Sequence, residues 1–95
     1  MLIVRPEAET DMIDAYNWYE GKNKNLGEKF IAEVDSVFNK IISNPEIYML
    51  AFQNTRRCLC QRFPYAIYFS IQKENIIVHA VLHQRQNPLM WQNRI

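Results

Sequence analysis

The carboxyl-terminal half of the chain has almost no acidic residues. Residues 1–50 carry five Lys or Arg and nine Asp or Glu, whereas residues 51–95 carry six and one, within a net charge of +1. Glu74 is the single carboxylate of that half, and it falls in a predicted hairpin turn. A catalytic triad or a glycosidase carboxylate pair is therefore excluded there. The asymmetry suggests a surface for an anion or an acidic partner, unless folding mixes the two halves.

Cysteines and long apolar runs are also scarce. Cys58 and Cys60 lie one residue apart, a spacing that disfavours a disulfide between them and fits reduced thiols in a cytosolic protein. No apolar run is long enough to span a bilayer, and the three apolar residues before Arg5 are too few for a signal peptide. With 48% hydrophobic residues among 95, we expect one folded cytoplasmic domain over residues 1–95, with no membrane partner.

Metal sites are not expected, and neither are cofactors. His79 and His83 lie four apart on a predicted strand, which places their Cα atoms about 13 Å apart, too far to share a metal ion. Cys58 and Cys60 lack the additional ligands that a zinc site requires. A nucleophile–base pair between either cysteine and His79 remains conceivable, although mid-strand cysteines are more often small buried hydrophobes.

Helical periodicity occupies the first half of the chain. Residues 2–4 read as a short strand, and a helix begins at Pro6 and ends at Gly21. Asn25 caps a second helix, which ends near residues 43–45. The buried stripes recur at helical spacing, with Ala8, Met12, Ala15, Tyr16 and Tyr19 on the first helix and Phe30, Val34, Phe38 and Ile41 on the second. The two helices therefore predict an antiparallel hairpin.

Strand patterns fill the second half. A connection over residues 44–55 precedes predicted strands at 56–62, 65–71 and 76–82, the last two separated by a polar turn, and Asn87 and Pro88 begin a short helix. The fold class is α+β in two layers. It has an N-terminal strand, the helix hairpin, a three-stranded antiparallel meander (β-α-α-β-β-β) and a short C-terminal helix.

Arginines and aromatics dominate the candidate functional residues, which are Arg56, Arg57, Arg62, Tyr65, Tyr68, His83, Arg85, Trp91 and Arg94. Arg matches phosphate geometry, and aromatics beside it can stack on bases. A metal-free ribonuclease could use His83 as acid or base and the arginines as a phosphate clamp. The alternatives are that His83 bonds a backbone carbonyl, that Trp91 anchors the tail helix, and that the arginines are solvated or dock an acidic protein.

Five segments in order resemble the RelE/ParE superfamily of bacterial toxins of type II toxin–antitoxin systems, on the ParE side. They are AETDMIDAYNWYE, LGEKF, NP at 44–45, RFPYAIYF and AVLHQRQNPLMWQNR. The resemblance spans nearly the whole chain and implies a helix hairpin on a small antiparallel-rich sheet. That fold agrees with the element order predicted from the residues.

The superfamily contains toxins that cleave mRNA on the ribosome, such as RelE, and toxins that poison DNA gyrase, such as ParE. The ribonuclease branch carries basic residues on the strand before the central one, an Arg on the central strand, and Arg and Tyr near the C-terminus. Arg57 and Arg85 match this pattern, whereas Leu59, Ala66 and Trp91 depart from it. The ribonuclease set is therefore depleted.

The resemblance thus implies a ParE-like plasmid-stabilization toxin that binds and poisons DNA gyrase and is not itself an enzyme. It also implies that a cognate antitoxin neutralises this toxin. An acidic antitoxin segment would suit the basic half, by helix-in-groove or strand-addition contacts. The alternatives are a ribosome-dependent mRNA endoribonuclease using His83, Arg85 and Arg57, or a member with lost or different toxicity. The expected target- or antitoxin-binding residues are Arg57, Arg62, His83, Arg85, Trp91 and Arg94.

Overall fold

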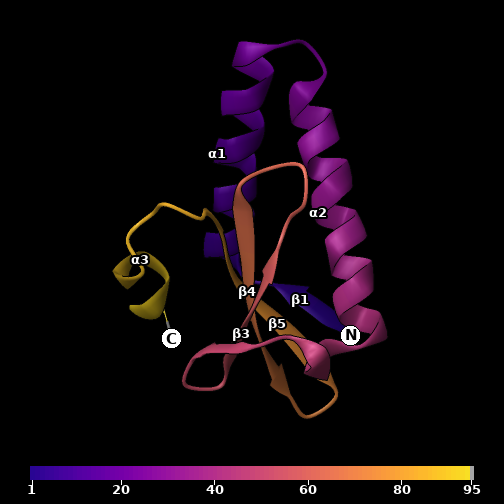
Figure 1. The fold of residues 1–95 in the computed structure, drawn as a ribbon, viewed down its shortest axis with the longest axis vertical. Helices are drawn as coiled ribbons and strands as arrows, with labels where there is room; N and C mark the ends of the chain where they lie inside the picture. Colours follow the sequence, from indigo (N-terminus) through magenta and orange to yellow (C-terminus); the bar gives the residue numbers. More distant parts are fainter. Residues whose placement is uncertain (95) are drawn as a thin grey trace.

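A computed structural model describes residues 1–94 and confirms the predicted α+β architecture (Figure 1). The helices are α1 (Pro6–Lys22), α2 (Leu26–Ser43) and α3 (Leu89–Gln92), and a 3-10 turn, η1, spans Pro45–Ile47. The strands are β1 (Leu2–Val4), β2 (Leu50–Phe52), β3 (Thr55–Leu59), β4 (Tyr65–Gln72) and β5 (Asn75–His83).

All the strands belong to one sheet with the order β1-β5-β4-β3-β2. β1 pairs with β5 in parallel, whereas β3, β4 and β5 form the predicted antiparallel meander. β2 is an addition, because residues 44–55 were predicted to be a connection without a strand. It has three residues and pairs irregularly with β3, so it is too short to show alternation in the sequence.

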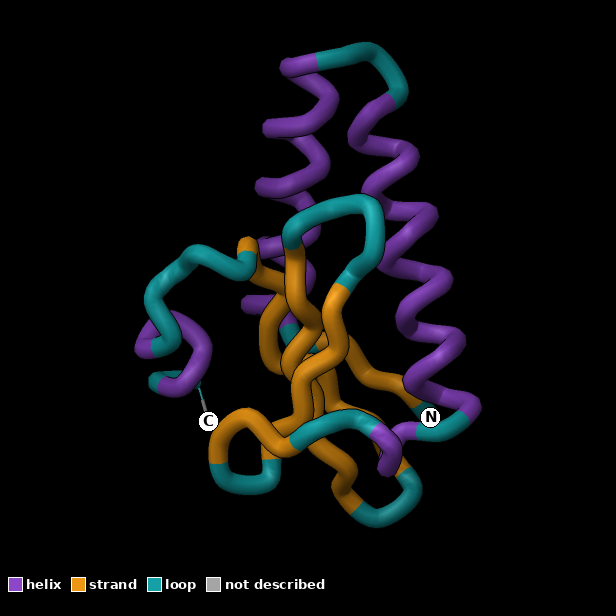
Figure 2. Tube along the Cα trace, in the orientation of Figure 1, coloured by secondary structure: helices purple, strands orange, loops and turns teal. Residues whose placement is uncertain are grey.

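The helix hairpin covers one face of the sheet and extends beyond its end (Figures 1 and 2). The apolar stripe of α2 packs against the central strands, and Phe30, Val34 and Ile41 are fully buried with Ile67 and Phe69 of β4. Burying each such side chain contributes about 1.5–3 kcal/mol relative to exposure. The opposite face of the sheet, called the far face below, carries α3 and the second cluster of buried residues.

The junction between α1 and α2 differs from the prediction. α1 continues one residue beyond Gly21, and the Asn25 side chain makes no capping hydrogen bond. The reason is that Asn25 adopts a left-handed backbone with φ of 69°, whereas a capping side chain needs an extended one. Glu20 of α1 replaces it, because its carboxylate accepts hydrogen bonds from the backbone N–H groups of Asn25 and Gly27, both at 3.0 Å.

A β-bulge at His79 divides β5 into two parts. Tyr68 lies opposite Ala80 and Phe69 opposite Val78, so His79 is the extra residue between them. Before the bulge Val78 packs into the core under the helix hairpin, and after it Val81 does so. The extra residue thus exchanges the faces of β5, so that beyond the bulge Val81 points toward the helices and Ala80 and Leu82 point to the far face. The His79 side chain forms a hydrogen bond with the Ser70 hydroxyl on the far face, whereas the His83 ring packs against Tyr65 on the face that the helices cover.

The two glycines provide a matched test of the hairpin packing. A Cβ at Gly27 would lie 2.7 Å from the backbone oxygen of Tyr16, whereas nothing lies within 4 Å of one at Gly21. We expect Gly27→Ala to lower the free energy of unfolding by about 1–3 kcal/mol, because the backbones must separate. Gly21→Ala, the control, should raise it by up to about 1 kcal/mol through helix propensity. Urea unfolding of both variants measures this, and equal stabilities would contradict the close approach.

Candidate partner-binding surfaces

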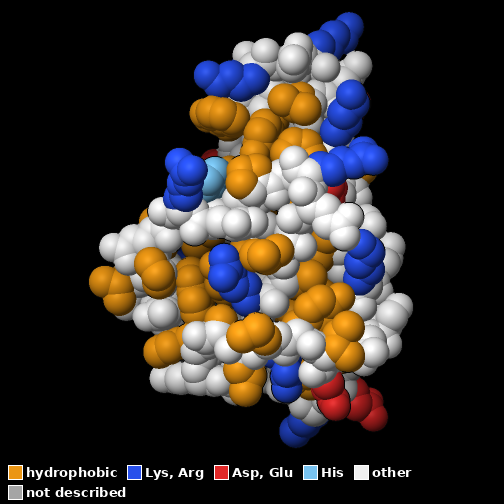
Figure 3. All heavy atoms as spheres, viewed as in Figure 1, with side chains coloured by type: hydrophobic (Ala, Val, Ile, Leu, Met, Phe, Trp, Pro, Cys, Tyr) orange, Lys and Arg blue, Asp and Glu red, His pale blue; other side chains and the backbone are white. Residues whose placement is uncertain are grey.

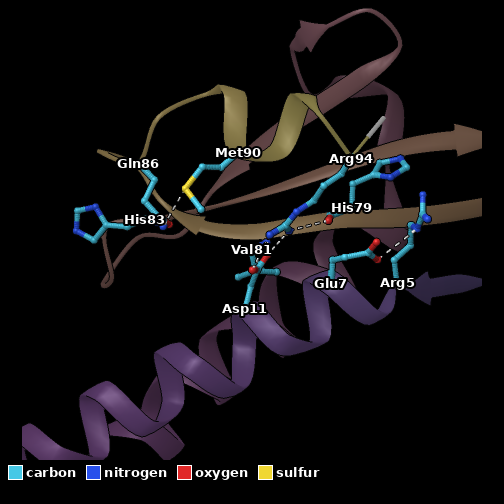
Figure 4. A network of polar contacts seen from close by, with 9 residues as sticks. All are labelled: Arg5, Glu7, Asp11, His79, Val81, His83, Gln86, Met90 and Arg94. Atoms are coloured by element: carbon cyan, nitrogen blue, oxygen red, sulfur yellow. Dashed lines mark hydrogen bonds and ion pairs between the residues drawn. The ribbon is translucent and has the colours of Figure 1, made fainter.

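The Asp11 carboxylate joins α1, β5 and the C-terminal tail (Figure 4). Its Oδ2 atom accepts hydrogen bonds from the Val81 N–H at 3.1 Å and from Arg94 Nη1 at 2.6 Å, and Oδ1 accepts from Arg94 Nη2 at 3.1 Å. Arg94 Nη1 also reaches the carbonyl oxygen of His79 at 3.3 Å. The hydrogen bonds that Arg94 donates to Asp11 raise the pKa of Arg94. Arg94, a predicted partner-binding residue, therefore has its guanidinium engaged inside the molecule.

Trp91 holds α3 against the far face. Its ring stacks on Tyr68 with the centroids 4.3 Å apart and meets Phe52 of β2 edge-on at 5.8 Å. The residue is only 5% exposed, so the structure gives Trp91 the anchoring role that the sequence analysis held as the alternative. A partner would contact this indole only at its rim.

Arg57 lies on the same far face, beside the stacked aromatics. Its guanidinium carbon is 6.0 Å from the Tyr68 ring centroid, a cation–π distance. Its Nε atom is buried without a hydrogen-bond partner in the described part of the chain. Leu59, Leu89 and Met90 are exposed on or beside this face, and Figure 3 shows hydrophobic side chains surrounding a cationic one near its middle. We name Arg57, Tyr68 and these three residues the far-face patch, and such a mixture is typical of protein-binding surfaces.

Ala66 occupies the position where the resemblance led us to look for a cation. It is fully buried on β4, opposite Leu59 of β3, and it packs in the far-face cluster with Leu82 and Trp91. The space beside Ala66 is therefore filled by hydrocarbon and aromatic groups. A guanidinium at this position would have no room and no counter-charge.

His83 and Arg85 lie at the end of β5. The His83 ring meets Tyr65 edge-on at 5.4 Å, and its Nδ1 atom accepts a hydrogen bond from the Arg85 N–H at 3.1 Å. The Arg85 side chain is exposed in the following turn. A groove of about 580 Å³ adjoins His83 between α1 and the ends of β4 and β5; its lining includes Asp11, Asp14, Ala15, Trp18, Tyr65 and Val81. We name it the α1–β5 groove.

Arg62 lies on the other side of the helix hairpin. Its backbone N–H donates to both carboxylate oxygens of Glu33, at 2.9 and 3.2 Å. A second groove, of about 600 Å³, runs along α2 beside Arg62 and carries the cationic side chains Lys29 and Lys40. This α2 groove therefore has three cations for one carboxylate.

The cysteines belong to the core and do not contact His79. Cys58 and Cys60 are buried on the helix-facing side of the sheet, whereas His79 bonds Ser70 on the far face. Burial raises the pKa of Cys58, and burial together with the Glu33 charge raises the pKa of Cys60 to about 12. The Cys–His pair considered from the sequence is therefore not formed.

The predicted functional residues do not converge on one site. Arg57 lies opposite Tyr68 on the far face, and His83 lies opposite Tyr65 on the helix-facing side. Residues 1–94 contain no group of three potential metal ligands and no helix long and apolar enough to cross a membrane. The geometry provides separate surfaces suited to binding, and it does not assemble an acid–base pair around a phosphate clamp.

Comparison with known proteins agrees with the fold. Residues 2–88 match the family model described as the ParE toxin of the type II toxin–antitoxin system parDE. A solved structure of the chromosomal ParDE system from P. aeruginosa is similar to 86% of this chain and 92% of its own, with 13% identity and a TM-score of 0.78. At that identity the structural likeness shows the fold alone. No curated protein matches the chain.

Removing one partner of the Asp11–Arg94 pair should be strongly destabilising, because the Arg94 and Asp11 side chains are only 19% and 10% exposed. We expect Asp11→Ala to lower the free energy of unfolding by about 3 kcal/mol, since it leaves a partly buried guanidinium and the Val81 N–H without their acceptor. Glu7→Gln is the control, because its pair with Arg5 is exposed and spans 3.8 Å, so its loss should cost under about 1 kcal/mol. Equal effects in denaturant unfolding would contradict this role.

His79 should make the protein less stable as the pH falls. Burial, with the Arg5 charge adding to it, lowers the pKa of His79 in the folded chain. The unfolded chain takes up this proton near pH 6.5, before the folded one does, so acidification below about 6.5 favours unfolding. We expect His79→Gln to remove this part of the pH dependence below about pH 6.5, and His83→Gln to retain it. Thermal melting at several pH values measures both slopes, and an unchanged slope in His79→Gln would refute the assignment.

Proposed function

The chain belongs to the family of ParE toxins of type II toxin–antitoxin systems, and we propose that it inhibits bacterial growth by binding and poisoning DNA gyrase in the cytoplasm. In this proposal the chain acts as one toxin domain over residues 1–95, and a cognate antitoxin neutralises it. It has no catalytic residues of its own, because a poison of this kind stabilises the cleaved-DNA state of its target by binding.

The separation of the ribonuclease-type residues is the observation that favours binding over cleavage. Arg57 lies on the far face, His83 packs against Tyr65 on the other side of the sheet, and Arg85 is exposed in a turn. A phosphate clamp and a general acid must meet within hydrogen-bond reach of one phosphodiester. The buried Ala66 removes the cation that would link them on the central strand.

The far-face patch is the surface best suited to the target. It combines exposed apolar side chains with the Arg57 guanidinium, whose Nε atom lacks a partner among residues 1–94. Interfaces concentrate their energy in such arginines and aromatics, and Arg57 is only partly buried, so a partner carboxylate can pair with its guanidinium charge. We therefore assign Arg57 to target binding.

The α2 groove is the surface best suited to an acidic antitoxin segment. Lys29, Lys40 and Arg62 line it, and its floor includes the buried Val37 and Phe63. An amphipathic segment can place apolar side chains on this floor and carboxylates toward the three cations. Arg62 thus has a proposed role in neutralisation rather than in poisoning.

Two assays on the purified protein test the proposed function. One measures supercoiling and the accumulation of cleaved DNA with gyrase, and the other measures mRNA cleavage on stalled ribosomes. We expect gyrase poisoning without cleavage of message. Message cleavage that is abolished by Arg85→Ala would replace the proposal with the ribonuclease function, and inactivity in both assays together with normal growth on expression would refute any toxicity.

A variant pair assigns the target surface. Arg57→Gln should weaken gyrase poisoning at least tenfold, because it removes the charge from the centre of the far-face patch. Lys24→Gln removes a charge from the exposed turn between α1 and α2 and should leave poisoning unchanged. Circular dichroism and thermal melting verify that both variants are folded. Equal potency of the two variants would show that the far-face patch does not contact the target.

A further inference from the structure

The exposed sulfur atoms of the molecule belong to methionine and not to cysteine. Cys58 and Cys60 are buried, and burial raises the pKa of both thiols, so the reactive thiolate form is disfavoured. Met12 is partly buried and packs against the core under the helix hairpin. The exposed methionines are Met1, Met49 and Met90, with exposed fractions of 83%, 81% and 47%. Because peroxides oxidise accessible sulfur atoms, these three side chains are open to oxidation.

Met90 is the exposed methionine that lies within the far-face patch. It precedes Trp91, whose ring stacks on Tyr68 with the centroids 4.3 Å apart, and the Arg57 guanidinium carbon lies 6.0 Å from the centroid of the same Tyr68 ring. Met49 precedes β2, and its carbonyl oxygen accepts a hydrogen bond from the Arg57 N–H at 3.0 Å. Met49 is therefore near the patch without belonging to α3, whereas a change at the Met90 sulfur alters the composition of the patch itself.

The Gln86 side chain connects the Met90 sulfur to the end of β5 (Figure 4). Its Oε1 atom accepts a hydrogen bond from the His83 N–H at 2.9 Å, and its Nε2 atom donates one to Met90 Sδ at 3.6 Å. A thioether sulfur is a weak acceptor. A sulfoxide oxygen is a stronger one and lies a bond length further out, so the Gln86 amide has to move in order to follow it. Oxidation of Met90 thus disturbs the link between β5 and α3.

We propose that Met90 is a peroxide-sensitive site, whose oxidation to the sulfoxide weakens binding of the target by the far-face patch and whose reduction restores it. The identity of the target rests on the proposed function. Leu59 and Leu89 are the other exposed apolar residues of the patch. A bound target would have to desolvate the sulfoxide dipole beside this hydrocarbon, which disfavours binding.

The oxidation is a two-electron step with hydrogen peroxide as the oxidant. The Met90 sulfur attacks one peroxide oxygen, so an S–O bond forms as the O–O bond breaks. The sulfur gives up two electrons, and the proton on the transferred oxygen passes to the departing hydroxide, which leaves as water. Methionine sulfoxide reductases reverse the change with two thiols, which become a disulfide while the oxygen leaves as water. The modification is therefore reversible.

Oxidation of the purified protein tests this site. The protein is treated with hydrogen peroxide, the peroxide is removed with catalase, and peptide mass spectrometry locates each added oxygen. Gyrase poisoning is then measured before and after treatment, and the ratio of the two potencies is the readout. We expect oxidation to lower the potency of the parent protein about tenfold, and methionine sulfoxide reductases to restore it. The ratio should stay near one in Met90→Leu, which cannot form the sulfoxide, whereas Met49→Leu should lose potency as the parent does.

Glutamine variants test the same site without an oxidant. Glutamine places a polar group near the position of the sulfoxide, so Met90→Gln should have about tenfold lower potency before treatment and no further loss after it. Met49→Gln is the matched control, and it should keep the potency of the parent. Circular dichroism and thermal melting verify that both variants are folded.

Failure of this inference differs from failure of the proposed function. Full potency of a protein in which Met90 is oxidised would overturn the inference and leave gyrase poisoning in place. Protection by Met49→Leu and not by Met90→Leu would overturn the assignment to Met90. Absence of poisoning by the untreated protein would refute the proposed function and the inference with it.

Discussion

The carboxylate of Asp11 fixes the relative positions of three parts of the molecule. It holds the first turns of α1 to the Val81 N–H of β5, and through Arg94 it holds the tail beyond α3. Because α3 brings Trp91 onto Tyr68, this carboxylate also sets the boundary of the far-face patch. A buried pair recovers little net energy after desolvation, so its main consequence is geometric. It determines which sheet surfaces stay open and which the tail covers.

The bulge at His79 creates the second constraint. Without the extra residue, β5 would turn Ala80 and Leu82 toward the helices and Val81 away from them. Both faces of β5 are apolar, so the sequence tolerates either register, and the shape of the two cores selects one. The same residue lies just beyond the region that β1 covers. From there on, the side chains of Arg94, Asp11 and Gln86 bond the backbone groups at the edge of β5.

The elements with long periodic patterns could be predicted from the sequence. The apolar stripe of α2 predicted this helix because burial spaces apolar residues at helical intervals. The strands β4 and β5 could be predicted because central strands are apolar on both faces. The cap on α2 could not be predicted, because it comes from Glu20, five residues away and on another helix. Trp91 and Arg94 were placed among the partner-binding candidates for a similar reason. Their partners Tyr68 and Asp11 lie far away in the sequence, and only the folded tail brings them together.

The charge asymmetry between the two halves of the sequence does not become one acidic face and one basic face. Arg94 pairs with Asp11, and the α2 groove brings Arg62 of the basic half beside Lys29 and Lys40 of the acidic half. Folding instead produces two grooves of opposite sign on the two sides of one helix hairpin. A nucleic acid presents a single sign of charge and favours a continuous cationic track. Grooves of opposite sign favour a protein partner that carries both positive and negative side chains. The placement of these charges can distinguish such a partner from closely related proteins.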